Sequence, residues 1–398
     1  MSTVRHFMNK RCVFHLSKVK TTLLWMDKQR RLFSTTKASN TVMSAWVIDR
    51  YGSNDVLRYT RNASFPDYRY PLTGIIKVVA AGLNPIDISM RGGYGVSSMS
   101  MQRDPLNINQ RGSEFPLILG RDFSGIIMEC PLSNPDFKVG DEVWAAVSPY
   151  KQGSLAEFVM MAMVELSPKP KSISHAEAAS IPFVGCTAWR ALVETGGLNE
   201  FNSANKRILI IGGSGGVGTF AIQLMKAWGA HVTVTCSQNA ERFLRDLGAD
   251  HVVDYTAGPV EEPLRDLEKF DLILDNIGGD TERWALGLLK PWKGAKYITL
   301  ISPFFENTDQ LGIPDGMLQN FATVFYKVVK HLANGVHYRW GFFQSDRIAL
   351  DIIGDMVDAG EIRPVVDETF SFSQVPQAFE KLEKGHARGK TVVQVSED

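Results

Sequence analysis

The stretch Ile208-Leu209-Ile210-Ile211-Gly212-Gly213-Ser214-Gly215-Gly216-Val217-Gly218 decides the fold of this 398-residue chain. Its first four residues are continuously apolar, as in a strand that is buried on both faces of a parallel sheet. Residues Gly213–Gly218 fit the pattern GxGxxG and open a predicted helix, Val217–Ala227, which is the context that the pattern requires. Such glycines let the backbone turn tightly and approach a pyrophosphate, and the helix N-terminus supplies free N–H groups and partial positive charge. The stretch therefore predicts a dinucleotide site, with Ser214, Gly215, Gly216, Val217 and Gly218 as cofactor-binding candidates.

The end of the next predicted strand distinguishes NAD from NADP. An Asp or Glu about 20 residues past the glycines would bind the ribose 2′-hydroxyl of NAD. This chain has Thr235-Cys236-Ser237-Gln238 at that place, with no acid. Ser237 can donate a hydrogen bond to a 2′-phosphate, and Arg242 can add positive charge. We therefore expect NADPH.

Two kinds of sequence pattern divide the rest of the chain. From Ala45 to about 173, short alternating strands and Gly/Pro turns predict a β-rich domain. Ser174 begins a helix with Glu177 three residues on, the pattern of a capping box. Strands and helices then alternate, which predicts a parallel sheet with helices on both faces. The expected elements are Arg207–Ile211, Val217–Ala227, His231–Thr235, Ala240–Leu247, His251–Val253, Phe270–Leu274, Trp284–Leu289 and Tyr297–Leu300. A later helix is expected over Val375–Glu383 and a last strand over Thr391–Val395.

Residues 302–335 interrupt this alternation of strands and helices with apolar side chains at helical spacing. They are Met317, Leu318, Phe321, Val324, Phe325, Val328, Val329 and Leu332. A helix face that packs on the domain is the favoured interpretation. The interface of a homodimer and contact with a membrane surface are the alternatives.

The first forty residues have the composition of a mitochondrial presequence, with nine Lys/Arg and one acid, Asp27. The remaining residues carry 34 basic against 42 acidic side chains, a formal net charge of −8. That charge argues against nucleic acid as a partner, because no basic surface is available to neutralise phosphates. The four cysteines are far apart, which predicts free thiols rather than disulfides or a cysteine zinc site. No apolar run is long enough for a transmembrane segment.

Further motifs accompany the glycine loop: Ala81–Asp87 (AGLNPID), Leu119–Gly125 (LGRDFSG), Gly140–Val143 (GDEV), Pro182–Trp189 (PFVGCTAW) and Gly385–Lys390 (GHARGK). With these motifs the chain resembles the zinc-independent quinone reductases of the medium-chain dehydrogenase/reductase superfamily, from about Trp46 to Val395. The resemblance implies an α/β fold: a GroES-like β-rich barrel domain plus a doubly wound Rossmann domain. The expected divisions are a presequence (1–40), a GroES-like catalytic domain (41–178), a Rossmann domain (179–345) and a C-terminal return to the catalytic domain (346–398).

The same resemblance implies further cofactor contacts beyond the glycine loop and Ser237. They fall on Tyr255, Asn276, Leu300, Gly341, Phe343, His386, Ala387 and Arg388. Zinc-dependent relatives place a Cys where Asn84-Pro85-Ile86 lies and a His-Glu pair where Arg121-Asp122 lies, so we expect no metal here. The remaining chemistry is hydride transfer to an acceptor that is already electrophilic, a quinone or an enone. Asn84 and Tyr94 are the candidate catalytic donors to the developing oxygen charge, with Arg91 and Asn276 behind them; a solvent proton is the alternative.

The presequence and the 302–335 insertion resemble a mitochondrial subgroup of this family. That resemblance implies a matrix enzyme linked to ubiquinone biosynthesis, with a reticulon and ubiquinone-biosynthesis proteins as partners. A non-catalytic NADPH-binding scaffold is the rival interpretation from another class. An alcohol dehydrogenase is a third, and it would require zinc.

Overall fold

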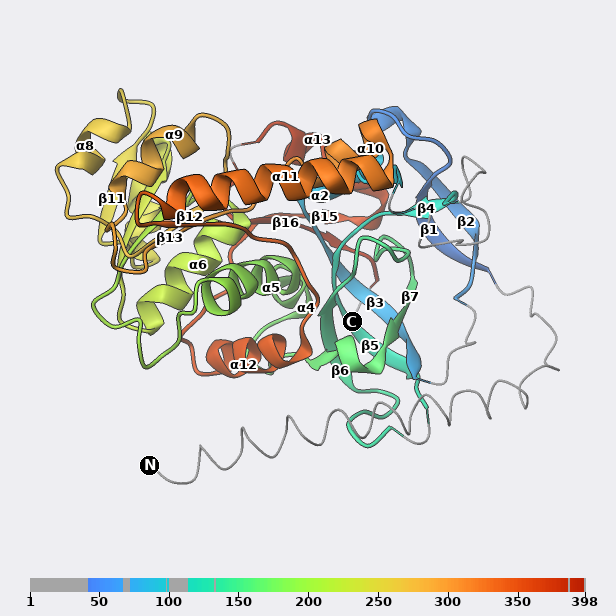
Figure 1. Cartoon of the computed structure of the whole chain (residues 1–398). Coiled ribbons are helices and arrows are strands. Elements are labelled where there is room, and N and C mark those ends of the chain that lie inside the picture. Colours follow the sequence, from blue (N-terminus) through green and yellow to red (C-terminus); the bar gives the residue numbers. More distant parts are fainter. Residues whose placement is uncertain are drawn as a thin grey trace.

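The computed structural model describes residues 42–66, 72–97, 99, 114–131, 134–385 and 387–396. The expected presequence and His386 lie outside the described residues. The chain forms two regions, one around a parallel sheet and one rich in antiparallel strands (Figure 1).

A six-stranded parallel sheet forms the cofactor-binding half that the glycine stretch predicts. Its strand order is β11-β10-β9-β12-β13-β14, the doubly wound order in which the first strand of the unit lies near the centre. The strands are β9 (Arg207–Ile211), β10 (His231–Cys236), β11 (His251–Asp254), β12 (Leu272–Asp275), β13 (Lys296–Thr299) and β14 (His337–Trp340). All neighbouring pairs are parallel, so the expected Rossmann sheet is confirmed.

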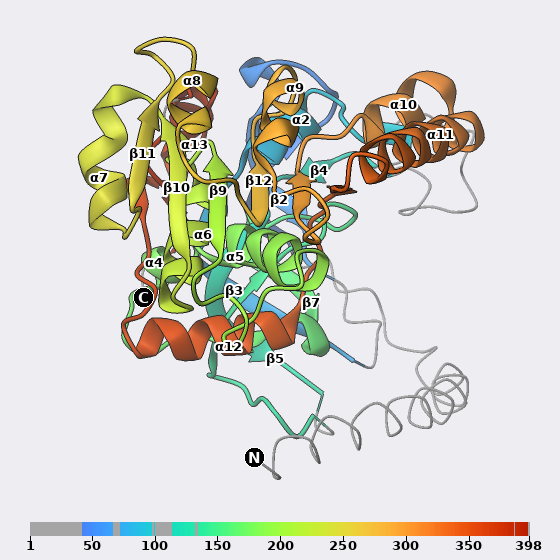
Figure 2. The same cartoon turned by 60° about the vertical axis from the view of Figure 1, so that its left-hand side comes forward.

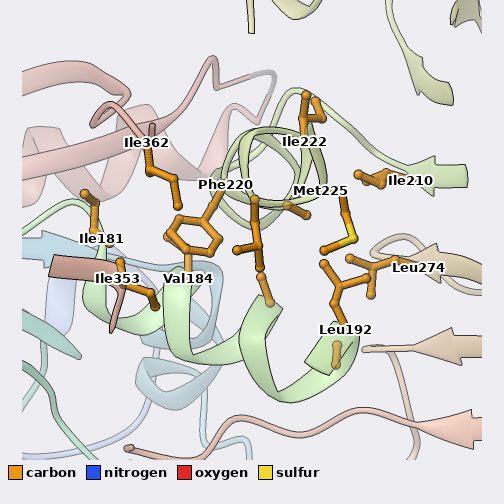
Figure 3. Close-up of a cluster of buried hydrophobic side chains, with 14 of the residues drawn as sticks. Ile181, Val184, Leu192, Ile210, Phe220, Ile222, Met225, Leu274, Ile353 and Ile362 are labelled. Atoms are coloured by element: carbon orange, nitrogen blue, oxygen red, sulfur yellow. The ribbon is translucent and has the colours of Figure 1, made fainter. Parts of the chain in front are cut away.

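Both faces of this sheet are buried. Ile208 and Ile210 of β9 pack into one cluster with α5 (Pro182–Trp189), α6 (Gly216–Ala227) and α12 (Arg347–Asp358), where Phe220 and Ile353 meet (Figure 3). Leu209 and Ile211 point the other way, into a cluster with α8 (Glu261–Arg265) and α9 (Thr281–Ala285). Each such buried aliphatic side chain contributes about 1.5–3 kcal/mol. The uninterrupted apolar run of β9 is therefore required by burial on both sides.

The β-rich half is built around β3 (Thr73–Leu83), as the strand pattern predicts. A seven-stranded sheet has the order β15-β16-β3-β5-β6-β8, with β7 also paired to β3, and a three-stranded sheet has the order β2-β1-β4. These strands are β1 (Val42–Ile48), β2 (Arg58–Ser64), β4 (Leu117–Ile118), β5 (Asp122–Glu129), β6 (Glu142–Ala146), β7 (Phe158–Ala162), β8 (Ser167–Pro168), β15 (Val366–Ser371) and β16 (Lys390–Gln394). Because β16 pairs antiparallel with β3, the end of the chain joins this sheet.

The helix boundaries follow local capping. The N-cap Ser174 of α4 (His175–Ala178) forms the expected capping box with Glu177. The next helix, α5, begins at Pro182, since proline suits the first helical position. The last helix, α13, spans Val375–Glu383 as expected, whereas β15 was not predicted. Its sequence Val-Asp-Glu-Thr-Phe-Ser is polar because β15 lies at the end of the sheet and pairs with β16 alone.

The insertion forms a helical hairpin, α10 (Phe304–Leu311) and α11 (Ile313–Leu332), that projects from the sheets (Figure 2). The expectation that its apolar residues pack on the domain is wrong for most of them. Val324 and Val328 are half-buried, but the other six are exposed. Among the described residues, no helix combines the length and the apolar character needed to cross a membrane.

Candidate functional site

The glycine loop joins β9 to α6 in the geometry that a phosphate site needs. Gly212 has a φ of +77°, which favours glycine, and Gly215 caps α6 in an extended conformation. A Cβ on Gly218 would lie 2.5 Å from the carbonyl oxygen of Gly212, whereas a Cβ on Gly215 would meet no atom within 4 Å. Gly218 therefore allows the helix to pack on the turn, and Gly215 borders open space. That space is a cradle that a side chain would fill.

The C-terminal loop lies beside the glycine loop. The Gly389 amide donates a hydrogen bond of 3.1 Å to the carbonyl oxygen of Ser214, and Gly389 forms an isolated parallel bridge with Gly215. Next to Gly389, the side chain of Arg388 is exposed and Ala387 is half-buried. The fold thus brings two of the three expected C-terminal contacts to the phosphate loop; the third, His386, is not among the described residues.

Three expected contacts follow the carboxyl ends of β10, β11 and β12. Ser237 is half-buried after β10, and Tyr255 is 48% exposed after β11. The Asn276 amide donates a hydrogen bond of 3.0 Å to the carbonyl oxygen of Ile211, while its Oδ1 is buried with no hydrogen-bond partner. An orphaned buried acceptor beside the glycine turn is a position where a ligand donor fits.

Arg242 lies one turn into the segment after β10. Its side chain is exposed, and within the described part of the chain no ion pair or hydrogen bond of this side chain is found. The guanidinium is therefore available to an anion, because the carboxylate of the preceding residue, Glu241, pairs with Arg245 at 2.9 Å.

The ends of β13 and β14 bring the remaining expected contacts together. The Gly341 amide donates to the carbonyl oxygen of Thr299 at 2.8 Å, and a Cβ on Gly341 would lie 2.7 Å from Cδ2 of Leu300. Phe343 stacks on Phe183 of α5, with ring centroids 4.1 Å apart and planes 15° apart. This stack fixes the segment after β14 against a helix that starts at the β-rich half.

Asn84 takes part in a buried charged network instead of facing a substrate. Its side chain is 1% exposed; Nδ2 donates to Oδ2 of Asp122 at 2.8 Å, and Oδ1 accepts from Nζ of Lys390 at 2.6 Å. The Lys390 ammonium also donates to Asp122 at 2.8 Å and to the carbonyl oxygen of Leu83 at 2.8 Å. Both ends of the amide are thus engaged within the protein, an arrangement that suits a positioning role.

Lys390 was not predicted as a site residue. The signal available in the sequence was a lysine at the start of an apolar strand, directly after the Gly389 that contacts the phosphate loop. The aliphatic part of the Lys390 side chain lies under that loop, since a Cβ on Gly216 would come within 2.9 Å of Cδ of Lys390. One side chain thus connects the loop to the buried network.

Arg121 fills a neighbouring position with a second cation. Its guanidinium is fully buried and donates to the carbonyl oxygens of Ile118, Ser148 and Lys151, with Nε 3.6 Å from Oδ1 of Asp87. An ammonium and a guanidinium repel a divalent cation, so the residues present do not fit a catalytic metal. No group of three His, Cys, Asp or Glu side chains is arranged to hold a metal within the described residues.

Tyr94 lies where the hairpin reaches the β-rich half. Its ring is edge-on to Phe305 of α10, 5.3 Å between centroids, and the Asp309 carboxylate accepts from the amides of Gly95 at 2.6 Å and Ser97 at 3.0 Å. Burial, with the nearby carboxylates of Asp309 and Glu306, raises the pKa of the Tyr94 phenol. Arg91, the reserve candidate, is instead buried against Glu383 and donates to Asn54 at 2.8 Å, contacts that hold the fold.

Comparison with known proteins agrees with this geometry. Two family models match, an alcohol dehydrogenase GroES-like domain over residues 72–171 and a zinc-binding dehydrogenase over residues 247–393. The mitochondrial NAD(P)H oxidoreductase RTN4IP1 of Danio rerio is 69% identical over 368 residues, which cover 92% of this chain and 95% of the relative. A chloroplastic NADPH-dependent alkenal/one oxidoreductase of Arabidopsis thaliana is 34% identical over 88% of this chain and 79% of its own. The solved quinone oxidoreductase of Coxiella burnetii superposes with a TM-score of 0.73 at 27% identity, covering 89% of this chain and 100% of that one.

Proposed function

The chain belongs to the mitochondrial NAD(P)H oxidoreductases of the medium-chain dehydrogenase/reductase superfamily, and on that premise we propose that it reduces a quinone or an enone with NADPH. The observation that carries the proposal is the cradle at Gly215, beside the end of β10, where Ser237 takes the place of a carboxylate and the next helix, α7 (Glu241–Asp246), brings Arg242. A carboxylate there would repel a 2′-phosphate, whereas a hydroxyl and a guanidinium bind one.

Each part of the site has a task in this proposal. The glycine loop and the N-terminus of α6 bind the pyrophosphate, with Arg388 beside them. Asn276 offers its unpartnered oxygen, and Leu300, Gly341 and Phe343 bound the inner end of the cofactor site. The reduced nicotinamide supplies the hydride. Tyr94 delivers a proton to the acceptor oxygen or to the carbon beside the carbonyl group, depending on the acceptor.

The nature of the acceptor follows from the buried cations. Since Lys390 and Arg121 occupy the region where a metal would polarise a carbonyl group, the acceptor must be electrophilic by itself. Quinones and enones meet that requirement. The names of two relatives, a quinone oxidoreductase and an alkenal/one oxidoreductase, support the same choice.

The chain is mitochondrial, as its relatives are. We further propose the matrix as its compartment and a precursor of ubiquinone as its acceptor, since the basic first forty residues suit import and a quinone suits the site. A relative in Caenorhabditis elegans is named for interaction with reticulon-4, so a reticulon is proposed as a partner too.

Turnover tests the proposal directly. Purified protein is mixed with NADPH and a panel of short-chain quinones and enones, and NADPH oxidation is followed by absorbance. We expect oxidation with at least one acceptor, and its loss in Gly215→Val, whose side chain enters the cradle and whose Cβ meets no protein atom within 4 Å. Tight NADPH binding with no oxidation by any acceptor would contradict the enzyme and favour the scaffold. Comparing quinone precursors in mitochondria with and without the protein then identifies the natural acceptor.

A further inference from the structure

We propose that Asp309, on α10 of the insertion, is a positioning residue that holds Tyr94 at the acceptor site, a role that rests on the proposed function, in which Tyr94 delivers the proton. The Asp309 carboxylate accepts hydrogen bonds from the amides of Gly95 at 2.6 Å and Ser97 at 3.0 Å, across 214 and 212 residues of sequence. Both amides belong to the segment that carries Tyr94. Hydrogen bonds to an ionised acceptor are about twice as strong as neutral ones, so two of them fix this segment to α10.

The local sequence gives the backbone of Tyr94 little constraint. Tyr94 lies between Gly93, with a φ of +98°, and Gly95, with a φ of +80°, conformations that glycine adopts without strain. On the N-terminal side, the Tyr94 amide donates to the carbonyl oxygen of Ser89 in the preceding helix at 2.9 Å. On the C-terminal side, the carboxylate of Asp309 adds an anchor from a distant part of the chain. The position of the phenol ring therefore depends on a tertiary contact.

The helix that carries Asp309 is itself held in place. Asn320 of α11 is 3% exposed, and its amide donates to the carbonyl oxygen of Phe304 at 2.9 Å. Further along α11, Lys327 donates to the Glu282 carboxylate of α9 at 2.7 Å. Figure 1 shows α11 extending from the cofactor-binding half toward the β-rich half, where α10 lies. Asp309 thus anchors the Tyr94 segment to a support that is fixed to the cofactor-binding half.

A row of aromatic rings connects Tyr94 with the inner end of the cofactor site. Beyond the contact of Tyr94 with Phe305, ring centroids are 5.2 Å apart between Phe305 and Phe304 and 5.4 Å apart between Phe304 and Phe342. Phe342 belongs to the segment after β14 that bounds the cofactor site in the proposed function. The first three rings are half-buried and Phe342 is 41% exposed, so ring surface remains for an acceptor. The anchored tyrosine and the cofactor end therefore line one continuous surface.

Steady-state kinetics with NADPH and a quinone test whether Asp309 acts through Tyr94. Asp309→Ala should lower kcat about 10- to 100-fold, because a misplacement of about 1 Å can cost a factor of about 100. The KM for the quinone and the Kd for NADPH should stay the same, which separates a misplaced donor from a damaged binding site. In the Tyr94→Phe background, which lacks the phenol proton, Asp309→Ala should lower kcat further by less than about twofold. Losses that multiply, or a wild-type kcat in Asp309→Ala, would overturn the proposal.

Glu306→Gln is the matched control. The Glu306 carboxylate is also near Tyr94, but it accepts its hydrogen bond from Gln310 of the same helix, at 3.4 Å. Removing this charge should leave kcat at pH 7 unchanged, and a loss equal to that of Asp309→Ala would assign the effect to charge instead of anchoring. Asp309→Asn has the same shape as the wild type and keeps one acceptor oxygen. It should lose less activity than Asp309→Ala, and it replaces that variant if alanine prevents folding.

Hydrogen exchange tests the anchor without turnover. Amides in the peptide that contains residues 93–97 should exchange about tenfold faster or more in Asp309→Ala than in the wild type, because hydrogen bonds to a charged group are lost. Equal exchange in the two proteins would overturn the anchor. A wild type that oxidises no NADPH would contradict the proposed function, while the exchange rates would still decide the contact. A wild-type kcat in Tyr94→Phe would overturn the catalytic role of the anchor and leave NADPH-dependent turnover intact.

Discussion

The ammonium group of Lys390 donates a hydrogen bond of 2.8 Å to the carboxylate of Asp122, across 268 residues of sequence. The two side chains are almost fully buried, and Asn84 joins them. The same Asp122 accepts a hydrogen bond from the Phe183 amide at the start of α5. The pair thus joins the last strand, a central strand of the β-rich sheet and the first long helix of the cofactor-binding half.

Removing the lysine should destabilise the fold. Lys390→Met leaves the Asp122 carboxylate buried without its cation, which typically costs about 3–5 kcal/mol. Urea unfolding should show a midpoint lowered accordingly, and Lys390→Met/Asp122→Asn should recover part of the loss. If Lys390→Met unfolds at the wild-type midpoint, the pair does not stabilise the protein.

Gly218, inside α6, and Gly215, the N-cap of α6, should respond differently to alanine. Gly218→Ala places a Cβ against the carbonyl oxygens of Gly212 and Gly213, and overpacking of this kind costs about 1–3 kcal/mol. Gly215→Ala faces open space and should leave the free energy of unfolding unchanged. Equal stability of the two variants in a denaturant titration would contradict this division of tasks.

Arg242 and Ser237 should set the preference for NADPH. Because a hydrogen bond to a charged group contributes about 1.5–3 kcal/mol, Arg242→Ala should raise the Kd for NADPH about tenfold or more. The Kd for NADH, which has no 2′-phosphate, should stay the same. Ser237→Asp should invert the preference. Fluorescence titration with both cofactors measures these changes, and a parallel loss of both affinities would indicate damage to the loop instead.

Tyr94 predicts a particular pH profile. Since the pKa of its phenol is raised above the ordinary 10, the proton is retained throughout neutral and mildly alkaline solution. A rate that depends on this proton should be flat from about pH 7 to 9 and should fall at a more alkaline pH than an ordinary phenol would give. Tyr94→Phe should lower kcat about 100-fold, the lower end of general acid catalysis. A variant with wild-type kcat would assign the proton to solvent.

The buried cysteines should be inert. Burial raises the pKa of Cys186 to about 12 and that of Cys236 to about 11, so at pH 8 only about one in 10⁴ and one in 10³ are thiolates. Peptide mapping after iodoacetamide treatment of the native protein should find Cys130, which is half-buried, modified before either. Rapid labelling of Cys186 at pH 8 would show that its environment opens in solution.

Features that depend on neighbours along the chain could be predicted from the amino-acid sequence alone. The apolar run of β9 and the glycines after it predicted the sheet, the turn and the cofactor loop. Such predictions succeed because the residue types of a short segment specify its burial and its backbone conformation. The capping box at Ser174 and the helix Val375–Glu383 followed from the same kind of local pattern.

Contacts between residues far apart in the sequence could not be predicted, because they depend on how the strands and helices pack. Asn84 was expected at a substrate and is engaged by Asp122 and Lys390, because the pairing of β16 with β3 delivers a lysine that no spacing along the chain connects to it. The apolar residues of α11 were expected to pack on the domain, yet six of the eight are exposed. Helical periodicity identifies an apolar face, but what covers that face depends on where the fold places the helix.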